Sequence, residues 1–302
     1  MNEAAISFKP IYLQQNQGLG NALRLALDNA AYELVARMDS DDISYPDRFE
    51  KELQCFNADS SLDIVGGEIT EFAGEVSNIT GKRTVKENDE EIRRDMKKRC
   101  AMNHVSVMYK KSSVTDAGGY LDWAWNEDYY LWIRMMLKGH KFKNVMSPMV
   151  SVRVGGAMSS RRGGIQYFRS EAGIQKYMLK NKIIGITRYC YNILIRFCGE
   201  VVATDALRTK LFRFFRKTYV PEKNDVADNR INANCPVDYP PFSVAMSVYE
   251  KDNAEWFDDA LSSIINQTVR PSEIVLVVDG PVPDGIQLVI DKYAEICSKN
   301  NN

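Results

Sequence analysis

Two acidic motifs are the clearest candidates for chemistry in this sequence of 302 residues. Asp39-Ser-Asp41-Asp42 ends a strand-like run, and Glu127-Asp128 begins an amphipathic helix. Asp39 and Asp41, two positions apart at an irregular strand end, can both approach one divalent cation, which prefers hard oxygen ligands. A carboxylate of Glu127-Asp128 could accept a proton from a substrate hydroxyl. The ordinary alternatives are an acidic turn that caps the next helix and a helix start at which acids suit the helix dipole.

The elements that position these motifs alternate between strands and helices. Residues up to 137 show strand patterns over 8–13, 33–38, 63–79 (with a break at Gly66-Gly67) and 104–109, and helix patterns over 19–30, 47–57, 87–98 and 127–137. A second unit near the end of the chain shows strands over 242–248 and 274–278, followed by helices over 256–265 and 286–296. This alternation predicts an α/β fold with a mostly parallel sheet that has helices on both faces.

Neither end of the chain is expected to complete such a sheet alone. Two strands and their helices in residues 242–302 are too few to cover a parallel sheet on both faces. The strand at residues 8–13 needs parallel neighbours that are reached by crossover connections. Joined end to start, the two parts give four strands alternating with helices, followed by the Asp-rich turn. Circular permutation is the simplest explanation. A truncated or tandem gene product, inactive or completed by exchange between copies, is the alternative.

Charge divides the chain into regions. Lys and Arg total 39 against 40 Asp and Glu, a net charge of -1, and no nucleic-acid-binding module is present, so we expect no nucleic-acid partner. Residues 161–220 differ, with 13 Lys/Arg and 3 Asp/Glu, a net charge of +10. Aromatic and aliphatic residues alternate with these Lys and Arg residues, which predicts helices that lie on an anionic membrane surface. A partly buried cap on the sheet is the alternative. Residues 221–241, with four prolines and no periodicity, predict a linker.

The cysteines and the hydropathy pattern indicate a compartment. Six cysteines lack metal-binding spacing, and no signal peptide is recognised, so we expect reduced thiols. No apolar run approaches the length of roughly 18 residues that a spanning helix needs. These observations predict a cytoplasmic protein, either free or peripheral on the inner face of the plasma membrane.

With its last part placed first, the sequence resembles the family 2 glycosyltransferases, inverting enzymes of the GT-A fold. The bacterial capsule, exopolysaccharide and O-antigen enzymes are the most similar group. Five motifs in a consistent cyclic order carry the resemblance: Phe242–Glu250 as the opening strand, Ile274–Gly280 as the second strand, Asn16–Gly20 as the Asn-x-Gly turn, Arg37–Asp42 as the DxD motif, and Asn126–Arg134 as the ED motif. The departure is the order, because the segment similar to residues 242–297 comes first in the family.

The resemblance implies roles for individual residues. Asp39 and Asp41 would hold Mg²⁺ or Mn²⁺, and Asp128 would be the general base, with Glu127 orienting the loop or a sugar hydroxyl. The partners would be a nucleotide-diphosphate sugar donor and a saccharide or lipid-linked saccharide acceptor. Donor-binding residues implied by the resemblance are Asn16, Gly18, Arg37, Asp39, Ser247, Tyr249, Glu250 and Asp279.

The resulting organisation has four regions. Residues 1–164 would form the acceptor and metal part of the GT-A domain, 165–220 a basic helical segment, 221–241 a linker, and 242–302 the nucleotide-binding part of the same domain. A non-catalytic nucleotide- or membrane-binding protein is the alternative of another class, and the intact motif carboxylates argue against it. A nucleotidyltransferase is disfavoured because the first strand is not followed by a Gly-rich basic loop.

Overall fold

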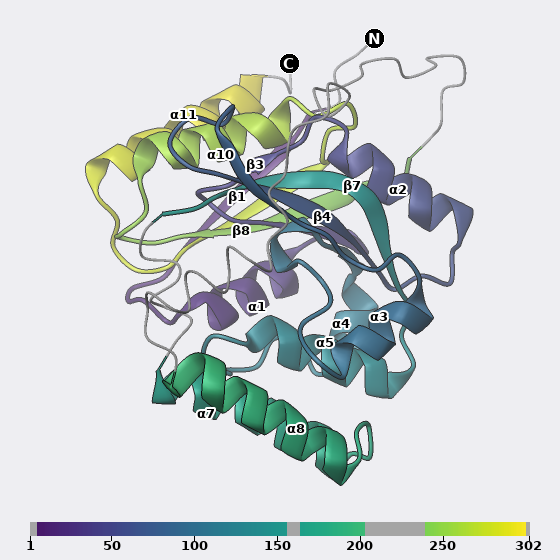
Figure 1. Cartoon of the computed structure of the whole chain (residues 1–302). Coiled ribbons are helices and arrows are strands. Elements are labelled where there is room, and N and C mark those ends of the chain that lie inside the picture. Colours follow the sequence, from purple (N-terminus) through teal and green to yellow (C-terminus); the bar gives the residue numbers. More distant parts are fainter. Residues whose placement is uncertain (1–4, 156–163, 203–238, 300–302) are drawn as a thin grey trace.

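The computed structural model describes residues 5–155, 164–202 and 239–299. In these ranges, nine strands form one sheet in the order β1-β9-β8-β2-β6-β4-β7-β3, with β5 paired to β4 (Figure 1). The strands are β1 (Ser7–Tyr12), β2 (Leu34–Met38), β3 (Ile43–Ser44), β4 (Ile64–Phe72), β5 (Ile79–Arg83), β6 (Met108–Lys110), β7 (Phe142–Arg153), β8 (Phe242–Val248) and β9 (Glu273–Val278). The helices are α1 (Leu19–Asn29), α2 (Arg48–Ala58), α3 (Asp89–Met96), α4 (Lys111–Asp116), α5 (Glu127–Lys138), α7 (Ile165–Lys180), α8 (Ile186–Arg196), α10 (Ala254–Ile265) and α11 (Asp284–Lys299).

The strands from the end of the chain lie inside the sheet. β8 pairs in parallel with β2, and β9 lies between β8 and β1, also in parallel. Every residue of β9 and of β2 is buried, as parallel strands covered on both faces require. Counted from β8 in the order β8, β9, β1, β2, the sheet reads 3-2-1-4, the order of doubly wound nucleotide-binding sheets. The fold is therefore a GT-A-like α/β architecture.

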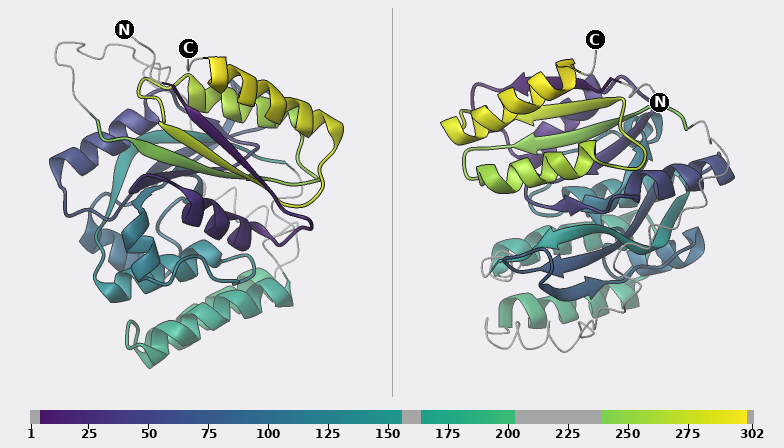
Figure 2. Two further views of the ribbon diagram at one scale, coloured as in Figure 1. Left: turned by 180° about the vertical axis from the view of Figure 1, so that it is seen from behind. Right: turned by 90° about the horizontal axis from the view of Figure 1, so that it is seen from above.

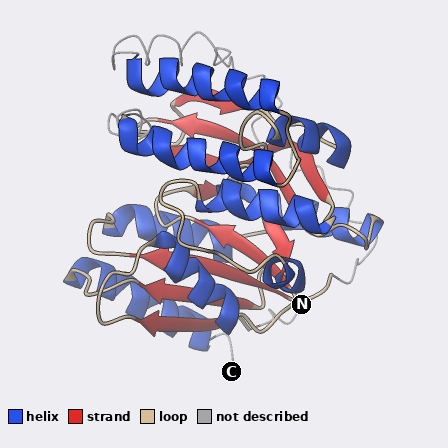
Figure 3. Ribbon diagram, turned by 90° about the horizontal axis from the view of Figure 1, so that it is seen from below, coloured by secondary structure: helices blue, strands red, loops and turns tan. Residues whose placement is uncertain are grey.

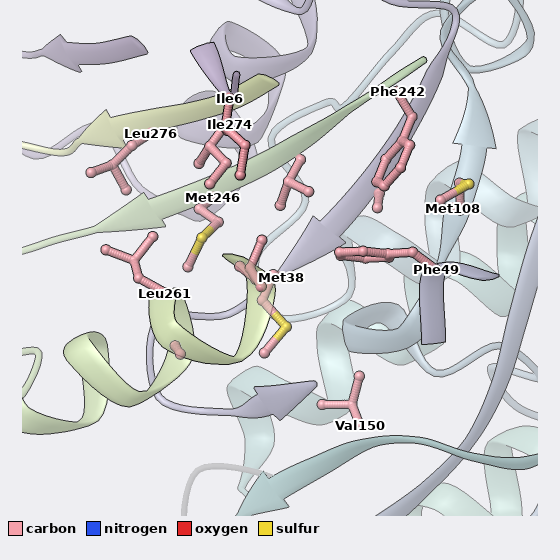
Figure 4. Close-up of a cluster of buried hydrophobic side chains, with 14 of the residues drawn as sticks. Ile6, Met38, Phe49, Met108, Val150, Phe242, Met246, Leu261, Ile274 and Leu276 are labelled. Carbon is pink, nitrogen blue, oxygen red and sulfur yellow. The ribbon is translucent and has the colours of Figure 1, made fainter. Parts of the chain in front are cut away.

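Helices cover the sheet from both sides and enclose two hydrophobic cores. One face packs against α2, α10 and α11, and the other packs against α1, α3, α4 and α5 (Figures 2 and 3). In the first core, the rings of Phe49 and Phe242 meet edge to face with centroids 5.0 Å apart (Figure 4). This contact joins α2 to β8, so the core itself holds the two ends of the chain together.

The other half of the sheet departs from the sequence prediction in three places. The predicted strand pattern over 63–79 is wrong at its end, because β4 ends at Phe72 and β5 begins only at Ile79. A strand over residues 104–109 is wrong at its start, because His104–Ser106 form a 3-10 turn and only Met108–Lys110 extend as β6. The Ser106 hydroxyl bonds to the carbonyl groups of Asn103 and Gly67, which favours the turn. The predicted break at Gly66-Gly67 is also absent: β4 runs through it, and the register with β7 shifts there instead.

The basic segment begins as a helical pair. α7 packs on α5, and α8 packs on α7, on the side of the molecule away from α10 and α11 (Figure 1). Residues 203–220 of the predicted basic helical segment and nearly all of the predicted linker lie outside the described residues. Among the helices that are described, none combines the length and apolar character needed to cross a bilayer.

The pairing pattern predicts that residues 239–302 are needed for folding. Removing them leaves β1 without β9, its only neighbour in the described sheet, and exposes the β2 edge, which creates an aggregation-prone surface. We expect the truncated chain to be insoluble. Ile274→Asp should have the same effect, since a buried charge costs several kcal/mol, on the order of 3–5. Leu288→Asp, at an exposed position of α11, should stay soluble. Soluble yield and circular dichroism are the measurements; a folded truncated chain would contradict the prediction.

Candidate active site

Four parallel strands bring the candidate residues to one edge of the sheet. Asn16–Gly18 follow β1, Asp279 follows β9, Tyr249 follows β8, and Asp39 follows β2. Because these strands are parallel, their carboxyl ends meet at the same edge. The strand order reverses between β8 and β2, and open α/β sheets bind ligands outside such a switch point.

The turn after β2 gathers three carboxylates. Asp39, Asp41 and Asp42 each offer an oxygen within 4.8 Å of the others. Asp42 is buried and accepts the backbone N–H of Arg153 at 2.9 Å, whereas Asp39 and Asp41 are only partly buried. Burial, followed by the charges of Asp39 and Asp252, raises the pKa of Asp41 to about 6. A hard divalent cation would relieve this repulsion, so the donor set fits Mg²⁺ or Mn²⁺.

Arg37 is a buried cation next to this turn. It is 2% exposed and forms an ion pair with Asp39. Its Nε and Nη1 atoms are buried and find no hydrogen-bond partner among the described residues. Its charge also partly offsets the burial that raises the pKa values of Glu127 and Asp128. Arg37 therefore lies under the influence of both acidic motifs.

Asp252 also lies at this site, although no sequence motif includes it. Its carboxylate accepts the Ser40 hydroxyl at 2.8 Å and the backbone N–H of Tyr249 at 3.1 Å. Burial is the main cause that raises the pKa of Asp252, and the charge of Asp39 adds to it. Asp252 thus links the acidic turn to the loop after β8. The only signal in the sequence is its position next to the Tyr249–Glu250 motif.

Arg153, at the end of β7, fixes the acidic turn from the other side. Besides its N–H contact to Asp42, its Nε donates to the Asp41 carbonyl at 3.2 Å. The guanidinium lies over the rings of Phe72 and Trp256, 4.6 Å from each centroid. The conformation of the turn is therefore determined by residues from β4, β7 and α10 as well as by β2.

Asp279 and the turn after β1 hold each other in place. The two Asp279 oxygens accept the backbone N–H groups of Gln17 at 2.7 Å and Gly18 at 3.0 Å. Gly280 adopts φ +92°, and a Cβ there would lie 2.8 Å from the Asn16 nitrogen, so the close approach requires glycine. Each Asp279 oxygen keeps a second lone pair. A contact from Asp279 to a nucleotide remains a prediction.

The other predicted donor-binding residues lie at the same edge. The Asp279 N–H donates to the Val248 carbonyl at 2.8 Å, which joins the ends of β9 and β8. Ser247 and Tyr249 are partly buried, and Glu250 is exposed. These positions bring the predicted donor-binding residues together at one edge of the sheet.

Glu127 and Asp128 begin α5 beside the turn after β1. A Cβ built on Gly20 would lie 3.9 Å from the Glu127 Cβ, so the starts of α1 and α5 are in contact. Burial and the charge of Asp128 raise the pKa of Glu127 to about 7, and burial also raises that of Asp128. Adjacent acids of this kind titrate as a pair. The pair can therefore hold one proton and one carboxylate near neutral pH.

Cys100, Arg83 and Tyr120 contact Asp128 or interact with its charge, and no sequence motif indicated these three. The Cys100 sulfur lies 3.6 Å from the Asp128 Oδ2, and Arg83 donates to the Cys100 carbonyl at 3.1 Å. His104 Nε2 lies 2.9 Å from the Tyr120 hydroxyl, and burial lowers the pKa of His104 well below its usual value. These residues come from β5, from the segment after α3 and from the loop before α5. Only the tertiary structure brings them together.

Comparison with known proteins identifies the class to which this fold and site belong. The sequence profile of glycosyl transferase family 2 matches residues 2–116. An uncharacterized glycosyltransferase of Haemophilus influenzae is 37% identical over 215 residues, which are 71% of this chain and 80% of that protein. The amylovoran biosynthesis glycosyltransferase AmsE of Erwinia amylovora is 33% identical over 184 residues, 61% of this chain and 68% of that protein. A UDP-Gal:alpha-D-GlcNAc-diphosphoundecaprenol beta-1,3-galactosyltransferase of Escherichia coli is 30% identical over 201 residues, 66% and 72% of the two chains. The chain belongs to glycosyl transferase family 2 and is a glycosyltransferase.

The crowded carboxylates predict that Asp41→Asn stabilises the metal-free protein. We expect a gain of about 1–2 kcal/mol in the free energy of unfolding at pH 8, because a pKa raised from 3.8 to about 6 corresponds to at most about 3 kcal/mol before solvent screening. Because the pKa of Asp41 is higher in the folded than in the unfolded state, its titration favours folding at pH values below its ordinary pKa. This contribution to stability is lost as the pH rises through about 6. The gain should therefore shrink towards pH 5. Denaturant unfolding in EDTA measures it.

Asp28→Asn, at an exposed position of α1, is the matched control for this measurement. The Asp28 carboxylate lies on the surface, so its loss should leave the free energy of unfolding within about 0.5 kcal/mol of the wild-type value at all pH values. A loss of stability in Asp41→Asn at pH 8 would show that Asp41 supports the fold rather than straining it.

Proposed function

We propose that this enzyme transfers a sugar from a nucleotide-diphosphate sugar to a lipid-linked saccharide acceptor during the synthesis of a cell-surface polysaccharide. The observation that carries the proposal is the convergence of the Asp39–Asp42 turn and the Glu127–Asp128 pair on Arg37 at the switch point of the sheet. The acidic turn suits a metal ion that stabilises the leaving diphosphate, and the Glu127–Asp128 pair suits removal of a proton from the acceptor hydroxyl. The relatives named for amylovoran biosynthesis and for a diphosphoundecaprenol-linked acceptor act in this kind of chemistry.

On the donor side, Asp39 and Asp41 would hold Mg²⁺ or Mn²⁺, which neutralises charge developing on the leaving diphosphate. The unpartnered donors of Arg37 suit an anionic group of the donor. Tyr249 would pack against the nucleobase, and the other nucleotide contacts would come from Asn16, Gly18, Ser247, Glu250 and Asp279. The Asp252 contacts keep the acidic turn and the Tyr249 loop at a fixed separation.

On the acceptor side, Asp128 would remove the proton from the attacking hydroxyl. Its burial raises its pKa, which makes the carboxylate a stronger base. Glu127, with a pKa near 7, can donate a hydrogen bond to a sugar hydroxyl while Asp128 remains ionised. A single base opposite the leaving group leads to an in-line displacement with inversion at the anomeric carbon.

We also propose that residues 1–164 and 242–302 form one catalytic domain with a circularly permuted order. The position of β8 and β9 between β1 and β2 supports this organisation. Exchange of the last segment between copies, as in a truncated tandem product, would give the same strand order within a dimer. Sedimentation velocity separates the two, since the permuted monomer has a mass of 34.4 kDa.

The lipid-linked acceptor places the reaction at a membrane, so we propose that the enzyme works as a peripheral protein on the inner face of the plasma membrane. The net charge of the described residues 164–202 supports this location, with six Lys or Arg against two Glu.

The reaction is tested by a screen of nucleotide-sugars in which release of the nucleoside diphosphate is measured. We expect turnover with one donor in Mn²⁺ or Mg²⁺ and its loss in EDTA. Asp41→Asn should lower turnover strongly, because it removes a charge that holds the ion. Mn²⁺ should also raise the melting temperature of the wild type more than that of Asp41→Asn. Full turnover in EDTA would refute the metal assignment.

The base is tested separately with Asp128→Asn. We expect sugar transfer to fall by about two to four orders of magnitude, the usual effect of removing a general base, while donor affinity changes little. Isothermal titration with the nucleoside diphosphate measures that affinity. Glu127→Gln is the matched variant and should lose less activity. Equal losses of affinity and transfer in Asp128→Asn would instead indicate that Asp128 only stabilises the start of α5.

A further inference from the structure

The face of α8 that points away from the protein is unusually apolar. In α8 and the adjoining residues Phe197–Val202, six large apolar side chains are between 41% and 64% exposed: Ile186, Tyr191, Leu194, Ile195, Phe197 and Val202. The opposite face of the helix is used for packing, with Ile184 just before α8 and Asn192 within it both buried. Exposed apolar side chains grouped on one helix mark an interaction surface.

Positive charge accompanies this apolar face. Arg169, Lys176 and Lys180 are exposed on α7 at spacings of seven and four, so they share one face of that helix. Arg188 is exposed on α8, and its guanidinium lies 5.8 Å from the ring centroid of Tyr191. Of the two glutamates in residues 164–202, Glu171 is neutralised by an ion pair with Arg196. The exposed faces of the packed pair α7 and α8 therefore combine apolar side chains with excess cations, which is the composition of helices that lie on anionic lipid.

The buried side of α8 is connected to the candidate base. Asn192 donates to the Lys97 carbonyl at 2.9 Å, and Arg196 donates to the Lys98 carbonyl at 2.7 Å. Lys97, Lys98 and Arg99 are exposed, and Lys98 and Arg99 share the carboxylate of Asp95 at 3.5 Å each, which leaves the loop with a net positive charge. The next residue, Cys100, is the one whose sulfur lies against Asp128. One short basic loop therefore runs from the back of α8 to the candidate base.

We propose that the exposed face of α8, with Arg188 and the exposed cations of α7, docks on an anionic bilayer, and that this contact brings the 97–99 loop and Asp128 near the lipid headgroups. The inference rests on the proposed lipid-linked acceptor, and it names the surface that presents the active site to that acceptor. Charge complementarity selects the bilayer as the occupant: a second copy of this basic surface would repel the first. The basic 97–99 loop, next to the base, also suits the diphosphate of a lipid-linked acceptor.

Vesicle flotation of the full-length protein tests the docking surface. We expect binding to vesicles of phosphatidylethanolamine and phosphatidylglycerol, and little binding to phosphatidylcholine alone. Leu194→Glu should lower the vesicle partition coefficient by roughly tenfold or more, because it removes an exposed apolar side chain and adds a repelled charge. Leu288→Glu is the matched control, since Leu288 is 69% exposed on α11, on the other side of the molecule, and it should bind as the wild type does.

A charge variant separates the two contributions. Lys176→Glu combined with Arg188→Glu should weaken binding to the anionic vesicles and reduce its dependence on salt, since each cation near such a surface contributes roughly fivefold. Circular dichroism shows whether the variants remain folded.

Equal binding to both vesicle types, or no difference between Leu194→Glu and Leu288→Glu, would overturn the proposal. So would a wild-type dimer in sedimentation velocity that Leu194→Glu dissociates, because the face would then bind a second copy.

Donor hydrolysis distinguishes failure of the docking surface from failure of the proposed function. Leu194→Glu should release nucleoside diphosphate at the wild-type rate in solution and lose activity only towards an acceptor embedded in vesicles. Normal donor hydrolysis without vesicle binding would refute the docking surface and leave the transferase proposal standing. If the wild type hydrolysed no donor but still bound vesicles, the transferase proposal would be refuted and the docking surface would stand.

Discussion

The placement of β8 and β9 between β1 and β2 is the constraint on which the site depends. A strand buried on both faces must have parallel partners on both sides, and β9 obtains them only from β1 and β8. The same pairing aligns the carboxyl ends of four strands, so that residues more than 200 positions apart come within hydrogen-bonding distance. The contacts of Asp279 with Gln17 and of Asp252 with Ser40 are direct consequences. Without this register, the two halves of the candidate site could not meet.

The site gathers negative charge that the fold alone does not neutralise. Burial and mutual repulsion raise the pKa values of Asp41, Asp42, Asp252 and the Glu127–Asp128 pair. Arg37 supplies one buried positive charge next to them. Perturbed carboxylates at the ligand-binding edge of a sheet are typical of functional sites, where stability is given up for chemistry. The rigid contacts of Arg153 and Asp252 keep the turn in place despite the repulsion.

Local patterns in the sequence predict the elements but not most of the site contacts. Alternating apolar runs and 3.6-residue periodicity place β2, β8, β9, α1, α5 and α10 within a few residues of their bounds, because these elements have strongly patterned faces. The acidic turn is also visible, since it directly follows an apolar strand. By contrast, Asp252 resembles an ordinary loop aspartate, and its partner Ser40 lies 212 positions away. The 3-10 turn at His104–Ser106 depends on the carbonyl of Gly67, which no local pattern reveals.

The order of the elements matters less to the site than their packing. α11 follows β9 and packs against β1, so the helix occupies the position of a crossover between these strands although no peptide bond joins it to β1. A parallel sheet is specified by register and by burial on both faces, and both are satisfied here by noncovalent contacts. Phe49 against Phe242 and the β2–β8 ladder connect the two parts through the core rather than through a linker. A permuted chain and two copies that exchange their last segment would therefore build the same edge, with the same carboxylates at the candidate site.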